Sequence, residues 1–143
     1  MIRVIVVDDH TVLRDGLRYL LEAQGDIQIV GMAANGQEAV EQASISCPDV
    51  ILMDISMPVM NGIEATKHIC KICENTKVAI LSMHHTTEYM QRALEAGAVG
   101  YLLKDSAGTE LVTAIRALHS GKRYLSQQVA KSLADDSKWK NGN

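Results

Sequence analysis

The sequence predicts an α/β fold: a doubly wound, five-stranded parallel sheet flanked by five helices. Short runs rich in β-branched residues alternate with longer segments whose apolar residues recur at helical spacing, and this alternation repeats five times. Such alternation favours a parallel sheet with helices on both faces. The length of 143 residues and the hydrophobic fraction of 47% are sufficient for one domain with its own core.

The strands are predicted where apolar runs stop at a polar or turn-forming residue. The first run ends at the pair Asp8-Asp9, and the third ends at Asp54, with Pro58 and Gly62 close behind it. A buried strand that stops at a loop produces this pattern. The five predicted strands comprise residues 2–7, 27–33, 49–53, 77–82 and 99–103.

The helices are predicted from apolar stripes and from the residues that start and end them. Asn35 followed by Glu38 is a helix N-cap pattern, and Pro48 ends that helix because the residue before proline avoids helical backbone. Gly97 and Gly121 are placed to end the last two helices. The five predicted helices comprise residues 11–24, 36–46, 62–73, 86–96 and 106–119. Their expected inner positions include Val12, Leu13, Leu17, Leu20, Leu21, Ile63, Ile69, Ile72, Leu111, Val112, Ile115 and Leu118.

The last part of the chain carries a weaker signal. Residues 124–126 are predicted to be an extended link and residues 127–134 a short helix, while the polar residues 135–143 are expected to be mobile. We therefore expect one domain over residues 1–121, followed by a partly disordered linker over residues 122–143.

Composition excludes several functional classes. The net charge is −3 and the 14 basic residues are scattered, so this chain has no basic footprint for nucleic acid. The apolar runs are too short to span a membrane, and the first residues lack the features of a signal peptide. Cys47, Cys70 and Cys73 are odd in number and lie inside periodic segments, which favours reduced thiols and a cytoplasmic location.

Polar residues follow four of the predicted strands. They are Asp8 and Asp9, then Asp54, Ser82 and Lys104. Because parallel strands end at one edge of a sheet, these side chains should meet there, where open α/β sheets bind ligands. Two carboxylates about 4 Å apart repel by roughly 4 kcal/mol at an effective dielectric constant of 20, and one lysine does not balance three of them. Carboxylate oxygens suit Mg²⁺, which neutralises phosphoryl oxygens, so we predict phosphoryl transfer with a carboxylate as nucleophile.

This arrangement resembles the receiver domain of two-component response regulators over residues 2–121. The motifs occur in the family's order: Asp8-Asp9, Asp54 followed by Met57-Pro58 and Gly62, Ser82, and Tyr101 three residues before Lys104. The stretches from Asp8 to Leu17 and from Gly100 to Asp105 are most similar to the NarL/FixJ (LuxR-type) branch. The resemblance implies a flavodoxin/CheY-like sheet with strand order 2-1-3-4-5.

The resemblance also implies a function for each residue of the site. Asp54 would accept a phosphoryl group from a sensor histidine kinase, and Lys104 would pair with its oxygens. Mg²⁺ (or Mn²⁺) would be bound by Asp9, Asp54 and the backbone carbonyl of Ser56, with Asp8 acting through a water molecule. The Ser82 hydroxyl would move toward the phosphoryl group.

Further expectations concern the response to phosphorylation. Tyr101 would turn inward behind Ser82 and repack the face formed by the fourth helix, fifth strand and fifth helix. Ser56 and His84 match positions that tune the lifetime of the phosphoryl group. A weak or phosphorylation-dependent homodimer is expected. DNA would be bound only by a helix-turn-helix output domain beyond this chain. The domain would assist only its own phosphorylation and dephosphorylation and would not be a turnover enzyme.

The sequence departs from many receivers in having Asp105, where a proline often follows the lysine. That difference leaves the geometry of the Lys104–Asp105 peptide bond open, because a cis bond before a non-proline residue costs roughly 3 kcal/mol. Three alternative functions have weaker support. An aspartyl-phosphatase would need a D-x-D motif after the first strand, and a flavin or nucleotide binder would need a phosphate-binding loop there. A receiver that serves only as a scaffold would not need an intact set of Asp9, Asp54 and Lys104.

Overall fold

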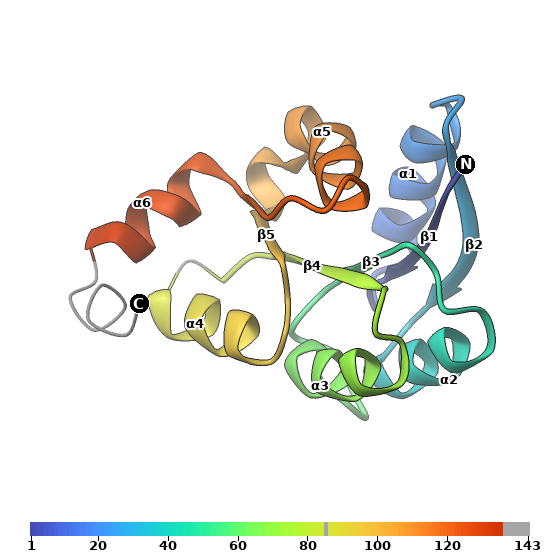
Figure 1. Cartoon of the computed structure of the whole chain (residues 1–143), viewed down its shortest axis with the longest axis horizontal. Helices are drawn as coiled ribbons and strands as arrows, with labels where there is room; N and C mark the ends of the chain where they lie inside the picture. The colour runs from blue at the N-terminus through green and yellow to red at the C-terminus, as the bar shows by residue number, and fades with distance from the viewer. Residues whose placement is uncertain (85, 136–143) are drawn as a thin grey trace.

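The structure is a computed structural model that describes residues 1–84 and 86–135 (Figure 1). In this part of the chain, six parallel strands form one sheet with the order β2-β1-β3-β4-β5-β6. The strands are β1 (Ile2–Val7), β2 (Ile27–Ala33), β3 (Val50–Met53), β4 (Lys77–Ser82), β5 (Gly100–Leu103) and β6 (Tyr124–Leu125). The helices are α1 (Thr11–Glu22), α2 (Gly36–Ser46), α3 (Gly62–Ile72), α4 (Thr87–Glu95), α5 (Ala107–His119) and α6 (Gln127–Asp135), with a 3₁₀ turn at Lys104–Ser106.

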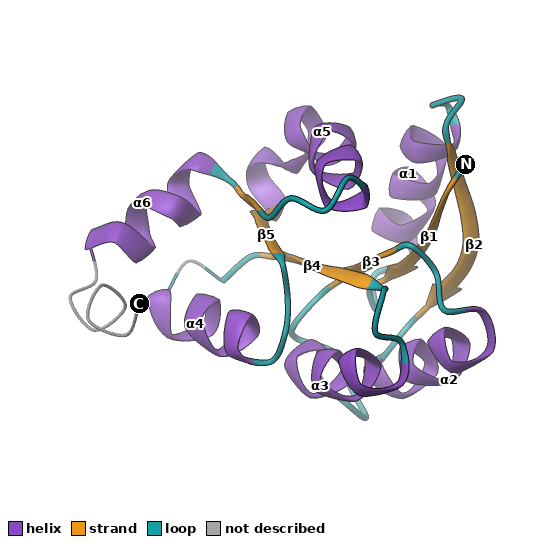
Figure 2. Cartoon of the chain, in the orientation of Figure 1, coloured by secondary structure: helices purple, strands orange, loops and turns teal. Residues whose placement is uncertain are grey.

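The helices cover both faces of the sheet, as Figure 2 shows. Leu17 and Leu21 of α1 join Leu111 and Ile115 of α5 in a core on one face. The core on the other face is formed with α2, α3, α4 and α6, which contribute Ala39, Ala43, Ile63, Ile69, Met90, Ala93, Val129 and Leu133. The strands between these two layers are almost entirely apolar, as expected for parallel strands that are buried on both faces.

The predicted helix boundaries are confirmed to within one or two residues. The Asn35 side chain accepts a hydrogen bond from the backbone N–H of Glu38 at 2.9 Å, and the Glu38 carboxylate accepts one from the N–H of Ala34 at 3.1 Å. Cys47 ends α2 in a left-handed conformation with φ of 38°. Gly97 follows α4 with φ of 115°, a conformation that glycine adopts without a Cβ penalty.

The prediction of five strands and five helices is wrong by one element of each kind. Leu125 of β6 pairs with Tyr101 of β5, so the sheet gains a sixth strand. The helix expected at residues 127–134 is present as α6, and it buries Val129 and Leu133 against the core. A two-residue strand leaves no periodic signal in a sequence, which explains the missed element. Residues 135–143 were expected to be mobile, and all of them except Asp135 lie outside the described residues.

Three further expectations need correction or are now settled. Val12 is 86% exposed and Ile72 48% exposed, so neither is an inner position. Val12 precedes Leu17 by five residues, which places it about 140° away around the helix axis. Ile72 is the last residue of α3, where the chain leaves the helix. The Lys104–Asp105 peptide bond is trans, because the described residues contain no cis bond.

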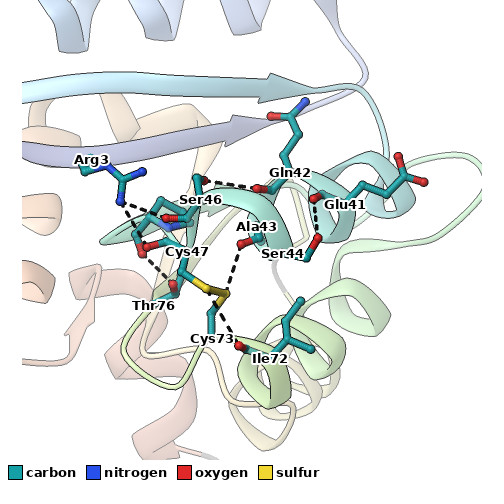
Figure 3. The surroundings of a disulfide bond; sticks show 11 residues. Arg3, Glu41, Gln42, Ala43, Ser44, Ser46, Cys47, Ile72, Cys73 and Thr76 are labelled. Atoms are coloured by element: carbon teal, nitrogen blue, oxygen red, sulfur yellow. Dashed lines mark hydrogen bonds between the residues drawn. A yellow bond between two sulfur atoms is a disulfide. The ribbon is translucent and has the colours of Figure 1, made fainter.

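The expectation of three reduced thiols is wrong in this structure. Cys47 and Cys73 form a disulfide with their Cα atoms 5.5 Å apart, while Cys70 is free. The two bonded residues follow the last residues of α2 and α3, which pack side by side and end near each other (Figure 3). That proximity depends on the tertiary packing, so residue spacing along the chain did not indicate it.

No helix within residues 1–84 and 86–135 combines the length and hydrophobicity that a membrane crossing requires.

Candidate functional site

The strand pairing brings the predicted acidic residues together. β1 lies between β2 and β3, so the direction in which strands are added to the sheet reverses at β1. Val7 of β1 is opposite Met53 of β3, and the Asp54 N–H donates to the Val7 carbonyl at 3.0 Å. Asp8 and Asp54 therefore leave neighbouring strands at the same edge. This crevice beyond the carboxyl ends of the strands is the usual ligand site of open α/β sheets.

Lys104 joins the two aspartates in a buried ion cluster. Its Nζ lies 2.7 Å from Oδ2 of Asp8 and 3.3 Å from Oδ2 of Asp54. Only 11% of the Lys104 side chain is exposed, and the two carboxylate side chains are 3% and 6% exposed. The other oxygen of Asp54, Oδ1, accepts a hydrogen bond from the N–H of Ile55 at 2.8 Å. The sequence-based prediction that Asp8, Asp54 and Lys104 converge agrees with this geometry.

The protonation equilibria of the two aspartates differ. Burial and the charge of Asp8 raise the pKa of Asp54, and the nearby ammonium of Lys104 only partly opposes them. Burial acts to raise the pKa of Asp8 as well, but hydrogen bonds from Lys104 and His10 outweigh it, so the net shift is downward. Burial acts to lower the pKa of Lys104, and its hydrogen bond and ion pairs with the two aspartates raise it overall. Lys104 is thus paired mainly with Asp8, whereas burial first, and the charge of Asp8 second, disfavour the ionised form of Asp54.

The cluster has the oxygen donors that a hard divalent cation needs. Potential ligand atoms of Asp8, Asp9, His10 and Asp54 all lie within 4.8 Å of one another. Three carboxylates face one lysine, and the raised pKa of Asp54 indicates that a further positive charge would be favourable there. Such a donor set fits Mg²⁺, which binds through one or two carboxylates and retains water. The part assigned to the Ser56 carbonyl stays a prediction.

Two residues that border the acidic cluster, His10 and Arg14, were not predicted from the sequence. His10 Nδ1 lies 2.9 Å from Oδ1 of Asp8 and 3.3 Å from Oδ1 of Asp9, so its ring borders the carboxylates that would bind the cation. Arg14 donates from Nη1 to the backbone carbonyl of Asp8 at 2.6 Å, which fixes the end of β1. The position of each residue was its only sequence signal. His10 directly follows Asp8-Asp9, and Arg14 lies four residues, about one helical turn, after His10.

The residues predicted to respond to phosphorylation are linked by hydrogen bonds. The Ser82 Oγ accepts from the N–H of His84 at 3.0 Å, and the Tyr101 hydroxyl donates to the His84 carbonyl at 3.2 Å. His84 Nε2 lies 2.7 Å from the Ser56 Oγ, and the His84 ring stacks on Tyr89 with centroids 4.1 Å apart. Ser82 and Tyr101 are both fully buried. Tyr101 occupies the inward position in this structure, and burial raises its pKa to about 12.

The loop after Asp54 is shaped by its glycine and by one strained residue. A Cβ at Gly62 would collide with the Asp54 carbonyl, so α3 can start this close to the acidic site only with glycine. Val59 in the same loop has φ of 70°, although it is β-branched and 81% exposed. A β-branched residue in the left-handed region is an outlier that usually reflects a local functional demand.

The chain is similar to known response regulators over most of its length. The model of the response regulator receiver domain matches residues 4–116. The chain is 45% identical over 130 residues to the transcriptional regulatory protein LiaR of Bacillus subtilis and 40% identical over 134 residues to the response regulator UvrY of Escherichia coli. These matches cover 91% and 94% of the chain, respectively, and 62% of each relative. The chain therefore spans less than two thirds of the length of these relatives.

Solved structures show the same similarity. A LuxR-family response regulator from Aurantimonas sp. SI85-9A1 superposes with a TM-score of 0.89 at 38% identity, covering 93% of this chain and 95% of that one. The isolated receiver domain of RcsB from Salmonella enterica serovar Typhimurium, solved with the phosphomimetic BeF₃⁻, gives a TM-score of 0.83 at 26% identity. That match covers 92% of this chain and 97% of the other.

Proposed function

Because the chain belongs to the response regulator receiver domain family, in its NarL/FixJ branch, we propose that Asp54 accepts a phosphoryl group from a sensor histidine kinase. The phosphorylated domain would then control a DNA-binding output domain and so transcription. The observation that carries this proposal is the position of Asp54. Its carboxylate is buried at the end of a central strand, beside a lysine and a second buried aspartate.

The surroundings of Asp54 support its use as a nucleophile. The Ile55 N–H holds one carboxylate oxygen in place, and Lys104 lies close to the other. A phosphoryl group on Asp54 would bring more negative charge, and Lys104 is near enough to pair with it. Preorganised charges of this kind contribute most where water is excluded, and the low exposure of all three side chains meets that condition.

The acid cluster is the proposed site of Mg²⁺ or Mn²⁺. Asp9, Asp54 and the Ser56 carbonyl would bind the ion directly, and Asp8 would bind through a water molecule. When bound, the ion neutralises phosphoryl oxygens as charge develops during transfer. Asp8 is held by Lys104 and His10, so it serves mainly to orient the site.

The hydrogen-bonded chain from Ser82 to Tyr101 supports a switch at α4 and β5. An attraction between the Ser82 hydroxyl and a phosphoryl group on Asp54 would act on the loop that carries His84 and leads into α4. That loop also accepts the hydrogen bond of Tyr101. Ser56 and His84, which are joined at 2.7 Å, are proposed to set the lifetime of the phosphoryl group by limiting access of water.

The remaining proposals extend the family assignment. The domain would work in the cytoplasm, where histidine kinases present their phosphoryl groups, and it would form at most a weak or phosphorylation-dependent homodimer. It would assist only its own phosphorylation and dephosphorylation. Residues 1–121 are proposed to be the receiver and residues 122–143 the linker to the output domain.

The test is the intact mass of the protein after incubation with acetyl phosphate, with and without Mg²⁺. Wild type should gain one phosphoryl group, roughly 80 Da, only when Mg²⁺ is present. Asp54→Asn should gain nothing. Asp15→Asn is the matched control, because Asp15 is an exposed aspartate on α1, away from the cluster.

Each other outcome contradicts a stated part of the proposal. A mass gain that persists in Asp54→Asn would move the phosphoacceptor to another residue. A gain without divalent metal would remove the role of the acid cluster in metal binding. No gain from acetyl phosphate, and none from any histidine kinase tested, would favour a scaffold that does not accept phosphate.

A further inference from the structure

The Cys47–Cys73 disulfide encloses the segment that carries the phosphoacceptor. The two cysteines are 26 positions apart, and the chain between them includes β3, Asp54 and α3. Cys47 follows α2 and Cys73 follows α3, so the bond joins the carboxyl-terminal ends of two helices on one face of the sheet (Figure 3). The disulfide is therefore placed to influence how firmly this segment is held.

The two cysteine residues differ in their exposure to solvent. Cys47 is exposed, whereas Cys73 is only 3% exposed. A surface pocket of about 440 Å³ opens beside the bond and is lined by both cysteines, Lys71, Glu74 and Asn75. The pocket gives a small thiolate a place beside the exposed Cys47, and its charged lining residues are one cation, Lys71, and one anion, Glu74. Attack at Cys47 would make the buried Cys73 sulfur the leaving group.

Each of the two cysteine sulfur atoms has a backbone carbonyl oxygen nearby that could accept a hydrogen bond from the reduced thiol. The Cys73 Sγ lies 3.2 Å from the Ala43 carbonyl oxygen, and the Cys47 Sγ lies 4.0 Å from that of Ile72. In the disulfide neither sulfur carries a proton, but after reduction each thiol would have a backbone oxygen within reach as its acceptor. A buried polar group with such a partner avoids the penalty of an unsatisfied donor.

After the bond opens, Arg3 of β1 would still fix the end of α2, and one hydrogen bond would still join the segments that follow α2 and α3. The Arg3 Nη1 donates to the Ser46 carbonyl at 3.0 Å and also reaches the Cys47 carbonyl at 3.4 Å. The Thr76 hydroxyl donates to the Pro48 carbonyl at 2.6 Å, which ties the start of β4 to the end of α2. The two thiols would stay close together, so the bond could form again.

We propose that Cys47–Cys73 is a thiol–disulfide exchange site whose reactants are low-molecular-weight thiols or dithiols. One argument rests on the proposed function: disulfides that form in the cytoplasm are usually transient, catalytic or redox-sensing. Placed there, this bond would make the stability of the phosphoacceptor segment depend on the thiol redox state. The geometric arguments hold wherever the protein works.

The exchange proceeds in two balanced steps. A thiolate RS⁻ attacks the Cys47 sulfur, an S–S bond to R forms, the Cys47–Cys73 bond breaks, and its electron pair leaves on Cys73. Cys73 then takes a proton from solvent. A second thiolate attacks the sulfur of R, which releases RSSR and the Cys47 thiolate. The protein gains two electrons, the two thiols lose them, and RSSR drives the reverse reaction.

The first test counts thiols in the folded 143-residue chain. The protein is equilibrated with mixtures of reduced and oxidised glutathione, quenched with acid, unfolded, alkylated and weighed intact. Oxidised wild type should show one alkylated cysteine, Cys70, and reduced wild type should show three. Reduction should also lower the melting temperature by roughly 10 °C, as expected from reopening a loop of this length in a chain of this size.

Matched cysteine variants test the proposed point of attack. Cys73→Ser leaves the exposed Cys47 unpaired and should form a mixed disulfide with oxidised glutathione at once, whereas Cys47→Ser leaves the buried Cys73 and should resist. Cys70→Ser is the control, because Cys70 is half-buried with its sulfur 3.7 Å from the Gly97 carbonyl oxygen. This variant should keep the full redox-dependent change in melting temperature.

Three results would overturn the proposal. They are a bond that opens only after the protein is unfolded, three free thiols in every glutathione mixture, and equal labelling of Cys73 and Cys47 in the two variants. None of these readouts uses phosphorylation. Failure of the exchange would therefore leave the phosphoacceptor proposal intact, and a chain that does not accept phosphate could still undergo exchange.

Discussion

The ionised carboxylate of Asp54 is energetically unfavourable in the folded protein. Burial and the neighbouring Asp8 raise its pKa, so the folded protein binds a proton at Asp54 more tightly than the unfolded chain does. Stability linked to this group is greatest below its unfolded pKa of about 3.9 and falls as the pH rises through the folded pKa. At neutral pH the charged form of Asp54 therefore destabilises the fold.

Asp54→Asn is expected to raise the melting temperature by a few degrees at pH 7 in the absence of divalent metal. The substitution keeps the size of the side chain and removes its charge, while Lys104 keeps Asp8 as its closest partner at 2.7 Å. The gain should shrink as the pH falls, because the raised pKa of wild-type Asp54 makes the folded protein take up a proton there more readily than the unfolded chain does. Added Mg²⁺ should stabilise wild type more than Asp54→Asn. Thermal unfolding across pH checks this expectation, and a variant less stable than wild type at neutral pH would contradict it.

Val59 carries local backbone strain. Its φ of 70° is a conformation that glycine adopts freely and that a β-branched residue adopts only at a penalty. Val59→Gly should therefore stabilise the protein by about 1 kcal/mol. Val12→Gly is the matched control, because Val12 is equally exposed but lies in helix α1, where glycine should destabilise by roughly 0.5–1 kcal/mol. Urea unfolding of both variants measures the difference, and effects of the same sign would refute the strain argument.

Ser56, two residues after Asp54, forms a side-chain pair with His84. The 2.7 Å contact between the two side chains and the stacking of His84 on Tyr89 hold the imidazole in place. His84→Ala should open the site to water and speed loss of the phosphoryl group by roughly three- to tenfold, which corresponds to about 1 kcal/mol. The measurement is the decay of phosphorylated protein after removal of acetyl phosphate. A slower decay would instead indicate that His84 assists the hydrolysis.

The last described helix, α6, packs against the part of the domain that contains Tyr101. The helix contacts α4 and β5, and its two fully buried residues belong to the same core as Tyr101. The preceding strand β6 pairs with β5, and the Ser126 N–H donates to the Tyr101 carbonyl at 3.1 Å. The described part of the proposed linker is thus attached to the region that the proposed switch would repack.

Leu133→Asp should release α6 without unfolding the domain. Leu133 is 1% exposed, and burying a leucine contributes roughly 1.5–3 kcal/mol, so its loss should increase amide hydrogen exchange in α6 about tenfold or more. The exchange of β1 and β3 should change little. Ala130→Asp introduces the same charge on the exposed side of α6 and should leave the helix attached. Equal exchange in the two variants would show that α6 is not held by its buried face.

Some of the secondary-structure elements and part of the site could be predicted from the sequence. Residues 2–7, 27–33 and 77–82 were predicted with the observed strand boundaries, because β-branched runs between turn residues carry a strong signal. Asp8, Asp54 and Lys104 were predicted to meet because parallel strands end at a common edge. Two of the remaining features depend on packing between distant segments: β6 beside β5, and the disulfide between α2 and α3. The contact of His10 with Asp8 is local, but it depends on the direction in which the His10 side chain points. No periodicity along the chain reports such contacts.

Across the whole molecule, a chain of contacts could transmit the effect of phosphorylation at Asp54 to α6. A continuous set of contacts exists: Ser82 bonds the His84 N–H, the His84 carbonyl bonds the Tyr101 hydroxyl, and Tyr101 lies in the core that α6 completes. The inward Tyr101 and the attached α6 occur together in this structure. We infer from the shared core that the two positions are coupled, so a ligand that favours inward Tyr101 should also favour attachment of α6.

We predict that BeF₃⁻ with Mg²⁺ slows amide hydrogen exchange in α6, and that Tyr101→Phe weakens this effect. The substitution removes only the hydroxyl that donates to the His84 carbonyl, so the aromatic ring still fills the core. Tyr124→Phe is the matched control, because it also removes one hydroxyl, which donates to the Glu110 carboxylate at 2.8 Å. Tyr124 lies in β6, and β5 separates β6 from β4. The response of Tyr124→Phe should equal that of wild type.

The possible outcomes separate two forms of coupling. If Tyr101→Phe abolishes the response while Tyr124→Phe keeps it, the hydrogen bond to the His84 loop carries the coupling. If both variants respond as wild type does, the signal passes through packing of the ring alone, since hydrogen bonds of about 1 kcal/mol would then be dispensable. If BeF₃⁻ leaves α6 unchanged even in wild type, attachment of α6 is independent of Asp54. Attachment of α6 would then depend only on whether the receiver domain is folded, and not on whether it is phosphorylated.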